Sequence, residues 1–196
     1  MRTLLLLALL LLPGAALAEV LNYDYVYLSK NGTESDRGSK GGDGVAGGGF
    51  KTFGKRTHVF LSYDDSAMYA GSNPNWDYDL KTWRVGVGGH YMIGKRTMIA
   101  PSLSVFRSSG EVMAPSWIAP RKLQGTGSIV QVDLRHAVTD WLELTAAARR
   151  SKFVDGASTE FVGGVMFHPN HNWAVGVLYH DREQKRSTEF TVRRYY

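Results

Sequence analysis

The sequence has no cysteine, only six prolines in 196 residues and, after its first twelve residues, no long hydrophobic run. Without cysteine the chain can form neither a disulfide framework nor a bacterial lipid anchor on a cysteine. Without an apolar run of about 20 residues, no segment of the mature chain can cross a bilayer as a helix. Any membrane insertion must therefore use strands, which span a bilayer only as a closed barrel.

The first eighteen residues have the three parts of a secretory signal peptide. Arg2 gives a positive start, residues 4–12 form a short apolar run, and Ala16-Leu17-Ala18 is the small-x-small pattern that signal peptidase reads. We therefore expect a signal peptide over residues 1–18 and one exported domain over residues 19–196. The net charge of +5 falls to about +4 when Arg2 is removed, and export separates the chain from nucleic acid, so we expect no nucleic-acid partner.

The stretch 83–107 has the pattern of two strands joined by a tight turn. Trp83, Val85 and Val87 lie on one side of a two-residue alternation, and arginine, glycine and histidine lie on the other. The chain turns at residues 93–96 and resumes the same alternation. A face of Arg, His, Ser and Gly is poor material for a dry core, but it suits the lumen of a barrel whose outer surface contacts lipid.

The alternation continues along the mature chain and predicts ten strands, with apolar side chains outside and charged ones inside. On the first strand we expect Tyr23, Tyr25 and Tyr27 to face lipid or the membrane interface. Tight turns at 53–57, 93–97, 138–140 and 168–172 alternate with longer loops at 29–44, 64–80, 108–125, 150–158 and 181–186. This alternation is typical of a barrel with its turns on one side of a membrane and its loops on the other.

We therefore predict an all-β fold, a closed antiparallel up-and-down transmembrane β-barrel preceded by a cleavable signal peptide. Ten strands are expected, with eight as the alternative, because the second and tenth strands are weakly patterned. A water-soluble sandwich would place the charged face outward and the apolar face inward. In lipid every backbone polar group must be paired, so the first strand should lie beside the last.

Five short stretches stand out by their order and spacing: residues 21–25 (LNYDY), 58–60 with Tyr63, 83–88 (WRVGVG), 141–144 (WLEL), and 167–170 with Asn172 and Trp173. In these the mature chain resembles the small Gram-negative outer-membrane barrels of the sulfation-dependent quorum factor family, and more broadly the OmpA/OmpX-like barrels. The resemblance implies an outer-membrane barrel without a known active site. It also implies that Tyr196 is the terminal aromatic residue read by the outer-membrane insertion machinery, although Arg194 departs from the apolar residue usual there.

Charges on the inward face form the first candidate site: Asp24, Arg84, Asp133, Arg135, Glu143, Arg149 and Glu160, together with His180. Charges in a confined lumen usually pair with one another and stiffen the barrel, because an unpaired buried charge is costly. Inward glycines nevertheless leave some space. We predict a lumen charge network, and the alternative is a narrow, porin-like channel for small solutes.

No catalytic residue, cofactor or metal site is predicted. Barrel enzymes of the lipid A deacylase type need a histidine with a nearby serine and an acid, and only His180 with Glu160 is roughly suitable. The loops are too short to resemble an omptin-type protease. His168 and His171 flank a turn, but no cysteine or carboxylate lies within that turn to complete a metal site.

Basic residues gather in the predicted loops and strand ends at one rim, and those expected to face lipopolysaccharide are Arg150, Lys152, Arg182, Lys185 and Arg186. Clustered arginines match lipid A phosphates bidentately, and the alternative is a rim that is simply charged and solvated. We predict a monomeric, non-enzymatic, integral outer-membrane barrel with an envelope-structural or surface-interaction role through its extracellular loops. Its expected partners are outer-membrane lipid, lipopolysaccharide and the insertion machinery.

Overall fold

The computed structural model describes residues 21–35, 41–69, 77–113, 121–153, 156–182 and 185–196, and the predicted signal peptide lies outside them. Among these residues no helix has the length and apolar character needed to cross a membrane. The described chain forms these strands: β1 (Tyr25–Ser35), β2 (Gly42–Phe53), β3 (Thr57–Tyr69), β4 (Asp77–Gly89), β5 (Tyr91–Ile93), β6 (Thr97–Met113), β7 (Arg121–Ala137), β8 (Leu142–Phe153), β9 (Gly156–Asn170), β10 (Trp173–Arg182) and β11 (Lys185–Tyr195).

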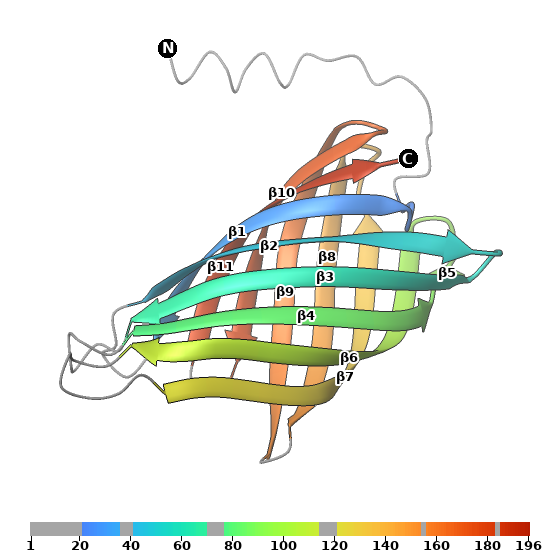
Figure 1. Ribbon diagram of the computed structural model, residues 1–196. Helices are drawn as coiled ribbons and strands as arrows, with labels where there is room; N and C mark the ends of the chain where they lie inside the picture. The colour runs from blue at the N-terminus through green and yellow to red at the C-terminus, as the bar shows by residue number, and fades with distance from the viewer. Residues whose placement is uncertain (1–20, 36–40, 70–76, 114–120, 154–155, 183–184) are drawn as a thin grey trace, which may run out of the picture.

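The strands form one closed antiparallel barrel (Figure 1). Strands that follow one another along the chain are paired, and the sheet closes where β1 pairs with β11, from Tyr25 opposite Tyr195 to Ser35 opposite Lys185. β4 and β5 are two parts of one strand, since both pair with β6. The barrel therefore has ten strands, which confirms the prediction over the alternative of eight.

Pro101 accounts for the interruption between β4 and β5. The pairing of β4 with β6 ends at Gly88 opposite Ser102 and resumes at Tyr91 opposite Ile99, so that Pro101 falls within the gap. A proline has no amide hydrogen to donate to the ladder, and strand pairing weakens beside it.

Tight turns join the strands at one end of the barrel. Gly54 and Gly94 have φ angles of 67° and 74°, in the left-handed region that glycine adopts at little cost. Each glycine begins the same four-residue sequence, Gly-Lys-Arg-Thr. The repeated motif is thus a turn signal, and the two remaining short turns, at 138–141 and 171–172, lie at the same end.

The predicted loop lengths are partly wrong. The connections at 36–41, 70–76 and 114–120 are longer than the turns, as expected, but β8 ends at Phe153 and β9 begins at Gly156. Likewise only residues 183–184 separate β10 from β11. Polar strand ends can continue the backbone ladder in water, where one face no longer has to be apolar. Hydrophobic periodicity therefore ends before the strands do.

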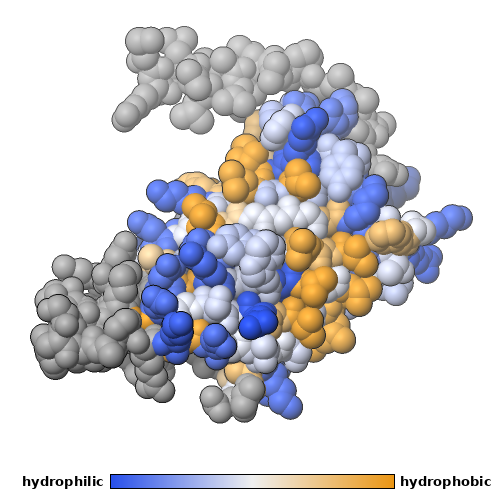
Figure 2. Space-filling model, in the orientation of Figure 1, coloured by the Kyte–Doolittle hydropathy of each residue, from blue (hydrophilic) through white to orange (hydrophobic). Residues whose placement is uncertain are grey.

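The outward-facing side chains are largely apolar, and the inward-facing ones are mostly polar, aromatic or small, with a few buried aliphatic residues such as Met166 and Leu178. Val85, Val132 and Val175 are 53%, 39% and 42% exposed, whereas Arg135 and Glu143 are buried. On the face drawn in Figure 2, hydrophobic side chains gather over the barrel wall, with hydrophilic ones toward both ends. This arrangement is the reverse of a water-soluble protein and confirms the predicted direction of the side chains on these strands.

The prediction for the first strand is wrong. Tyr25 is only 6% exposed and faces the lumen with Tyr23, whereas Leu28 is 68% exposed and faces outward with Val26. Both sets of residues are hydrophobic enough to face lipid, so their alternation does not say which set lies outside. Inside the lumen the Tyr25 ring packs against the rings of Phe50 and Tyr195, at centroid distances of 4.7 and 5.4 Å.

Candidate functional site: the barrel lumen

Aromatic rings fill the lumen near the short turns. The ring of Tyr25 stacks on that of Phe50 with centroids 4.7 Å apart, and Phe50 stacks on Phe60 at 4.9 Å. The ring of Tyr23 lies 4.2 Å from that of His58. Tyr23, Tyr25, His58 and Phe60 are all buried. These rings come from the first three strands and from Tyr23, just before β1, and they form a floor across one side of the barrel.

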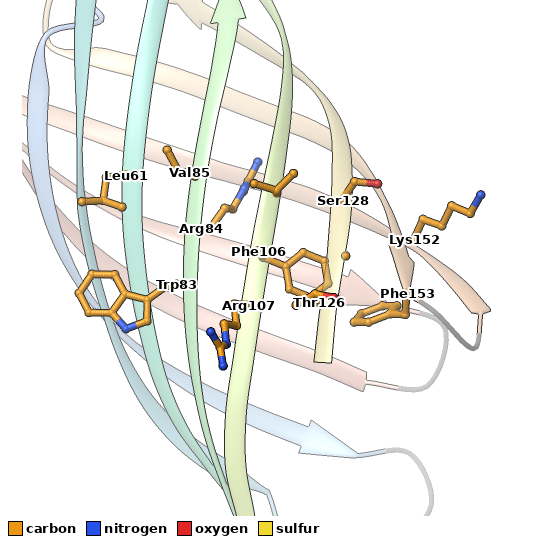
Figure 3. A pocket seen from close by; sticks show the side chains of 12 residues that line it. Leu61, Trp83, Arg84, Val85, Phe106, Arg107, Thr126, Ser128, Lys152 and Phe153 are labelled. Atoms are coloured by element: carbon orange, nitrogen blue, oxygen red, sulfur yellow. The ribbon is translucent and has the colours of Figure 1, made fainter. Parts of the chain in front are cut away.

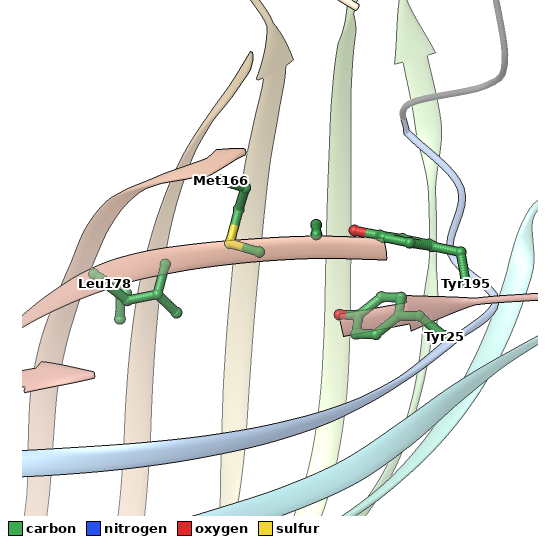
Figure 4. Close-up of a cluster of buried hydrophobic side chains, with 6 residues drawn as sticks. Tyr25, Met166, Leu178 and Tyr195 are labelled. Carbon is green, nitrogen blue, oxygen red and sulfur yellow. The ribbon is translucent and has the colours of Figure 1, made fainter. Parts of the chain in front are cut away.

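A second buried cluster extends this floor onto the neighbouring strands β9, β10 and β11. Tyr195 of β11, Met166 of β9 and Leu178 of β10 pack together with Tyr25, and Figure 4 shows the two tyrosine rings beside each other inside the barrel. Met166 is fully buried. Tyr23 also packs against the buried Met98 and Ala100 of β6, so that the floor extends from neighbouring strands β9, β10, β11, β1, β2 and β3 to the far wall.

An ion-pair cluster lies at the same end of the lumen. Arg135 donates from Nε to Glu143 Oε1 and from Nη2 to Glu143 Oε2, each at 2.7 Å, in a bidentate pair. His168 Nε2 lies 3.2 Å from Glu143 Oε2, and Arg193 Nη1 lies 4.0 Å from Oε1. Arg135 also donates to the Tyr195 hydroxyl at 3.2 Å. One buried carboxylate thus holds three basic side chains from three strands.

A separate polar chain runs along the lumen wall on three neighbouring strands. Arg84 donates from Nε to Ser104 Oγ at 2.7 Å and from Nη2 to Gln131 Oε1 at 2.9 Å. The Gln131 amide in turn donates to both carboxylate oxygens of Asp133, at 2.7 and 2.8 Å. The Arg84 guanidinium also lies 4.8 Å from the centre of the Phe60 ring, a cation–π contact. These bonds link the adjacent strands β4, β6 and β7 on their lumen side.

The third group of charges lies on β8 to β11. His180 Nδ1 lies 2.8 Å from Glu160 Oε1, and His180 Nε2 lies 3.0 Å from Glu189 Oε2. Arg149 Nη1 lies 3.8 Å from Glu160 Oε2. Because both ring nitrogens of His180 face carboxylates, neither is placed to take a proton from a serine hydroxyl. The geometry is that of an ion-pair network, not of a nucleophile and its base.

Above the floor, the lumen holds a cavity of about 420 Å³. Tyr23, Tyr25 and Phe50 line its lower end, and Arg182 and Lys185 line it on the loop side. Arg84, Asp133, Arg149 and Glu160 are among its wall residues, whereas Arg135, Glu143 and His168 do not reach it. The described part of the lumen is therefore a polar cup that is closed at the short-turn end.

Six of the seven predicted network charges lie in the lumen, and Asp24 does not. Asp24 precedes β1 on the outward-facing side of the alternation, where it accepts a hydrogen bond from Lys51 Nζ at 2.6 Å and another from the Thr52 amide. Its outward position follows from the same reversal that places Tyr23 and Tyr25 inside.

The ionisable lumen residues that are absent from the predicted network include His168, Glu189 and Arg193. Glu189 and Arg193 lie on β11, which has a weak pattern because Arg194 occupies an outward position expected to be apolar. The alternation of Phe190 and Val192 could have revealed Glu189 and Arg193. Both apolar side chains face outward, so the residues beside them in the sequence face the lumen. His168 was expected in a polar turn, but β9 continues to Asn170 and carries it inside.

The predicted basic rim divides into two groups. Arg150, Lys152 and Arg186 are exposed on the outer surface, and Arg186 Nε lies 4.0 Å from Asp181 Oδ1. Arg182 and Lys185 instead line the lumen cavity. Within the described ranges, no group of three His, Cys, Asp or Glu side chains could hold a metal ion.

The sequence matches no protein-family model and no curated protein. Solved barrels do resemble the structure. The transport unit of the autotransporter AIDA-I from Escherichia coli gives a TM-score of 0.57 at 10% identity, over 97% of this chain and 96% of that one. The β domain of the Bordetella autotransporter Brka gives 0.56 at 11% identity, over 88% and 98%. The translocator domain of NalP from Neisseria meningitidis gives 0.51 at 11%, over 100% and 95%. At such identity these likenesses establish the fold alone.

Proposed function

We propose that the chain is a non-enzymatic, integral outer-membrane barrel with a closed lumen, which stabilises the envelope or mediates surface contact through its loops and rim. The observation that carries this proposal is the contrast between the apolar outer wall and the ion-paired interior, in which Arg135 and Glu143 are buried while Val85 is exposed. Water-exposed valines in such number are costly for a soluble protein, and lipid removes that cost.

The height of the apolar wall supports the membrane placement. From Trp83 to Ile93 the outward side of one strand spans ten residue steps, or about 33 Å along the strand at about 3.3 Å per step. A strand tilt of about 40° reduces this to a height of about 25 Å, the usual apolar band of an outer-membrane barrel. Exposed aromatic residues lie at both edges, including Trp83 and Tyr179 on the loop side and Trp173 and Tyr196 on the turn side.

The orientation follows from the connections. Outer-membrane barrels place short turns in the periplasm and longer loops outside, so the Gly54 and Gly94 turns would be periplasmic, and the strand ends at Tyr69 and Met113 would be extracellular. The signal peptide expected over residues 1–18 and the terminal Tyr196 fit export and recognition by the insertion machinery. The resemblance to the quorum factor family fits the same location.

A narrow channel is the second candidate, favoured by the cavity of about 420 Å³ in the lumen. The floor of Tyr23, Tyr25 and Phe50 argues against it, because conduction requires a path that continues past these rings. Barrels of this size are commonly filled by their own side chains.

Planar-bilayer recordings separate the two candidates. The closed lumen predicts no single-channel steps from the purified, refolded chain in a bilayer where a general porin gives clear steps. Reproducible steps that disappear in Arg84→Trp, which fills the middle of the lumen, would overturn the closed-lumen proposal and support the channel. A change in lipid A mass in cells that overexpress the chain would contradict the non-enzymatic assignment.

A further inference from the structure

An apolar hollow of about 700 Å³ lies on the barrel wall, and Arg84 and Phe106, which also line the lumen cavity, contribute to its lining. Residues from β3, β4, β6, β7 and β8 line it, and Figure 3 shows Leu61 and Trp83 on one side and Lys152 on the other. Outward-facing Val85 and Val105 form much of its apolar surface.

Small side chains on β7 create the hollow. The strand register places Thr126 beside Arg107 of β6, and Ser128 between Val105 of β6 and Lys152 of β8. Thr126 and Ser128 are therefore short residues in rows that are otherwise bulky. Their hydroxyl groups also place hydrogen-bond donors on the floor of an otherwise apolar surface.

Two cations flank this part of β7. Arg107 and Lys152 are exposed, line the hollow, and have no carboxylate partner among the described residues. The outward-facing Lys51, in contrast, pairs with Asp24 at 2.6 Å. Adjacent strands lie about 4.8 Å apart, so the strands on the two sides of β7 are about 10 Å apart. Both long side chains can therefore reach an anion bound over Thr126 and Ser128.

We propose that this hollow binds one phosphorylated lipid, with an acyl chain along Val85 and Val105 and a headgroup phosphate between Arg107 and Lys152. An apolar surface that ends in two unpaired cations complements a molecule with an apolar tail and an anionic head. The hollow lies toward the loop end of the barrel. On the orientation given under Proposed function, on which this inference rests, that end meets the outer leaflet, and the occupant is lipid A.

The test uses the full mature chain refolded in detergent and native mass spectrometry, with diphosphoryl lipid A as the probe and phosphatidylcholine as the neutral comparison. Arg107→Gln with Lys152→Gln removes the two cations, and Ser128→Trp fills the hollow without changing charge. Matched controls lie on the far side of the barrel, where Lys30 and Thr188 face outward on β1 and β11. They are Lys30→Gln and Thr188→Trp.

We expect wild type and both controls to retain one lipid A molecule in preference to phosphatidylcholine. The double charge variant should lower the retained fraction by about tenfold or more, since each basic residue contributes substantially to binding of an anionic headgroup. Ser128→Trp should lower it by about tenfold or more as well, because the indole ring fills the hollow. Equal retention by all variants would overturn the proposal, as would an affinity for phosphatidylcholine equal to that for lipid A. Displacement by inorganic phosphate at equal molar amounts would also overturn it, because the site would then recognise the anion alone.

Failure of this inference is distinguishable from failure of the proposed function. Each variant is first checked for heat-modifiable gel migration, which reports barrel folding independently of lipid A. If the chain shows this shift and inserts into bilayers but retains no lipid A, only the proposed lipid A site in the hollow is refuted. A chain that never shows the shift refutes the membrane barrel itself.

Discussion

At the scale of single residues, Glu143 has the largest expected effect on stability. Its carboxylate is buried and lies within 4.0 Å of groups on Arg135, His168 and Arg193. Desolvating these charges is costly, and the pairing offsets that cost only while every partner is present. Inward position could be predicted for Arg135 and Glu143 from alternation, but their pairing with each other could not, because periodicity gives the face of a residue and not its height in the barrel.

Glu143→Gln should therefore destabilise the folded barrel by about 3–5 kcal/mol, because it leaves buried guanidinium groups without a counter-charge. Reversible urea unfolding in lipid vesicles, followed by tryptophan fluorescence, measures the change. The matched control is Asp140→Asn, whose carboxylate lies 3.8 Å from Arg96 on the exposed surface and should cost under about 1 kcal/mol. Equal effects of the two variants would contradict the structural role of the cluster.

At the scale of elements, the two Gly-Lys-Arg-Thr turns illustrate what local sequence determines. The turns at Gly54 and Gly94 could be predicted because a tight hairpin needs a residue with positive φ, and both glycines have one. The strand ends beyond the apolar band could not be predicted, because backbone hydrogen bonds between polar residues leave no periodic pattern in the sequence. β8 therefore continues to Phe153 and β9 already begins at Gly156, so both strands enter a segment that the sequence predicts as a loop.

Replacing Gly94 with alanine should cost about 1–2 kcal/mol, because an alanine in the left-handed region is strained. Urea unfolding in vesicles again provides the measurement. Gly163→Ala is the control, since Gly163 lies within β9 with nothing within 4 Å of an added Cβ. It should change stability by less than about 0.5 kcal/mol. A Gly94 variant as stable as this control would show that the turn glycine is dispensable.

At the scale of the whole molecule, closure into ten strands and the outward direction of the apolar face could be predicted from the sequence. The contents of the lumen could be predicted only in part. Tyr23 and Tyr25 form its floor although their pattern allowed a lipid-facing position, and the hollow over Ser128 depends on which residues three neighbouring strands bring side by side. Register between two strands is set by the turn that joins them and by the hydrophobic pattern of both, so a single strand read alone does not give it.

The most direct test of the account is the location of the apolar wall, and the absence of native cysteine makes it accessible. Single substitutions Val85→Cys, Val132→Cys and Val175→Cys, with Ser102→Cys and Thr191→Cys for the lumen, are labelled with a fluorophore in the unfolded chain. The variants are then refolded into vesicles that contain brominated acyl chains. We predict strong quenching at the three valine positions and little at the two lumen positions. Equal quenching at all five, or quenching confined to the lumen positions, would contradict the account.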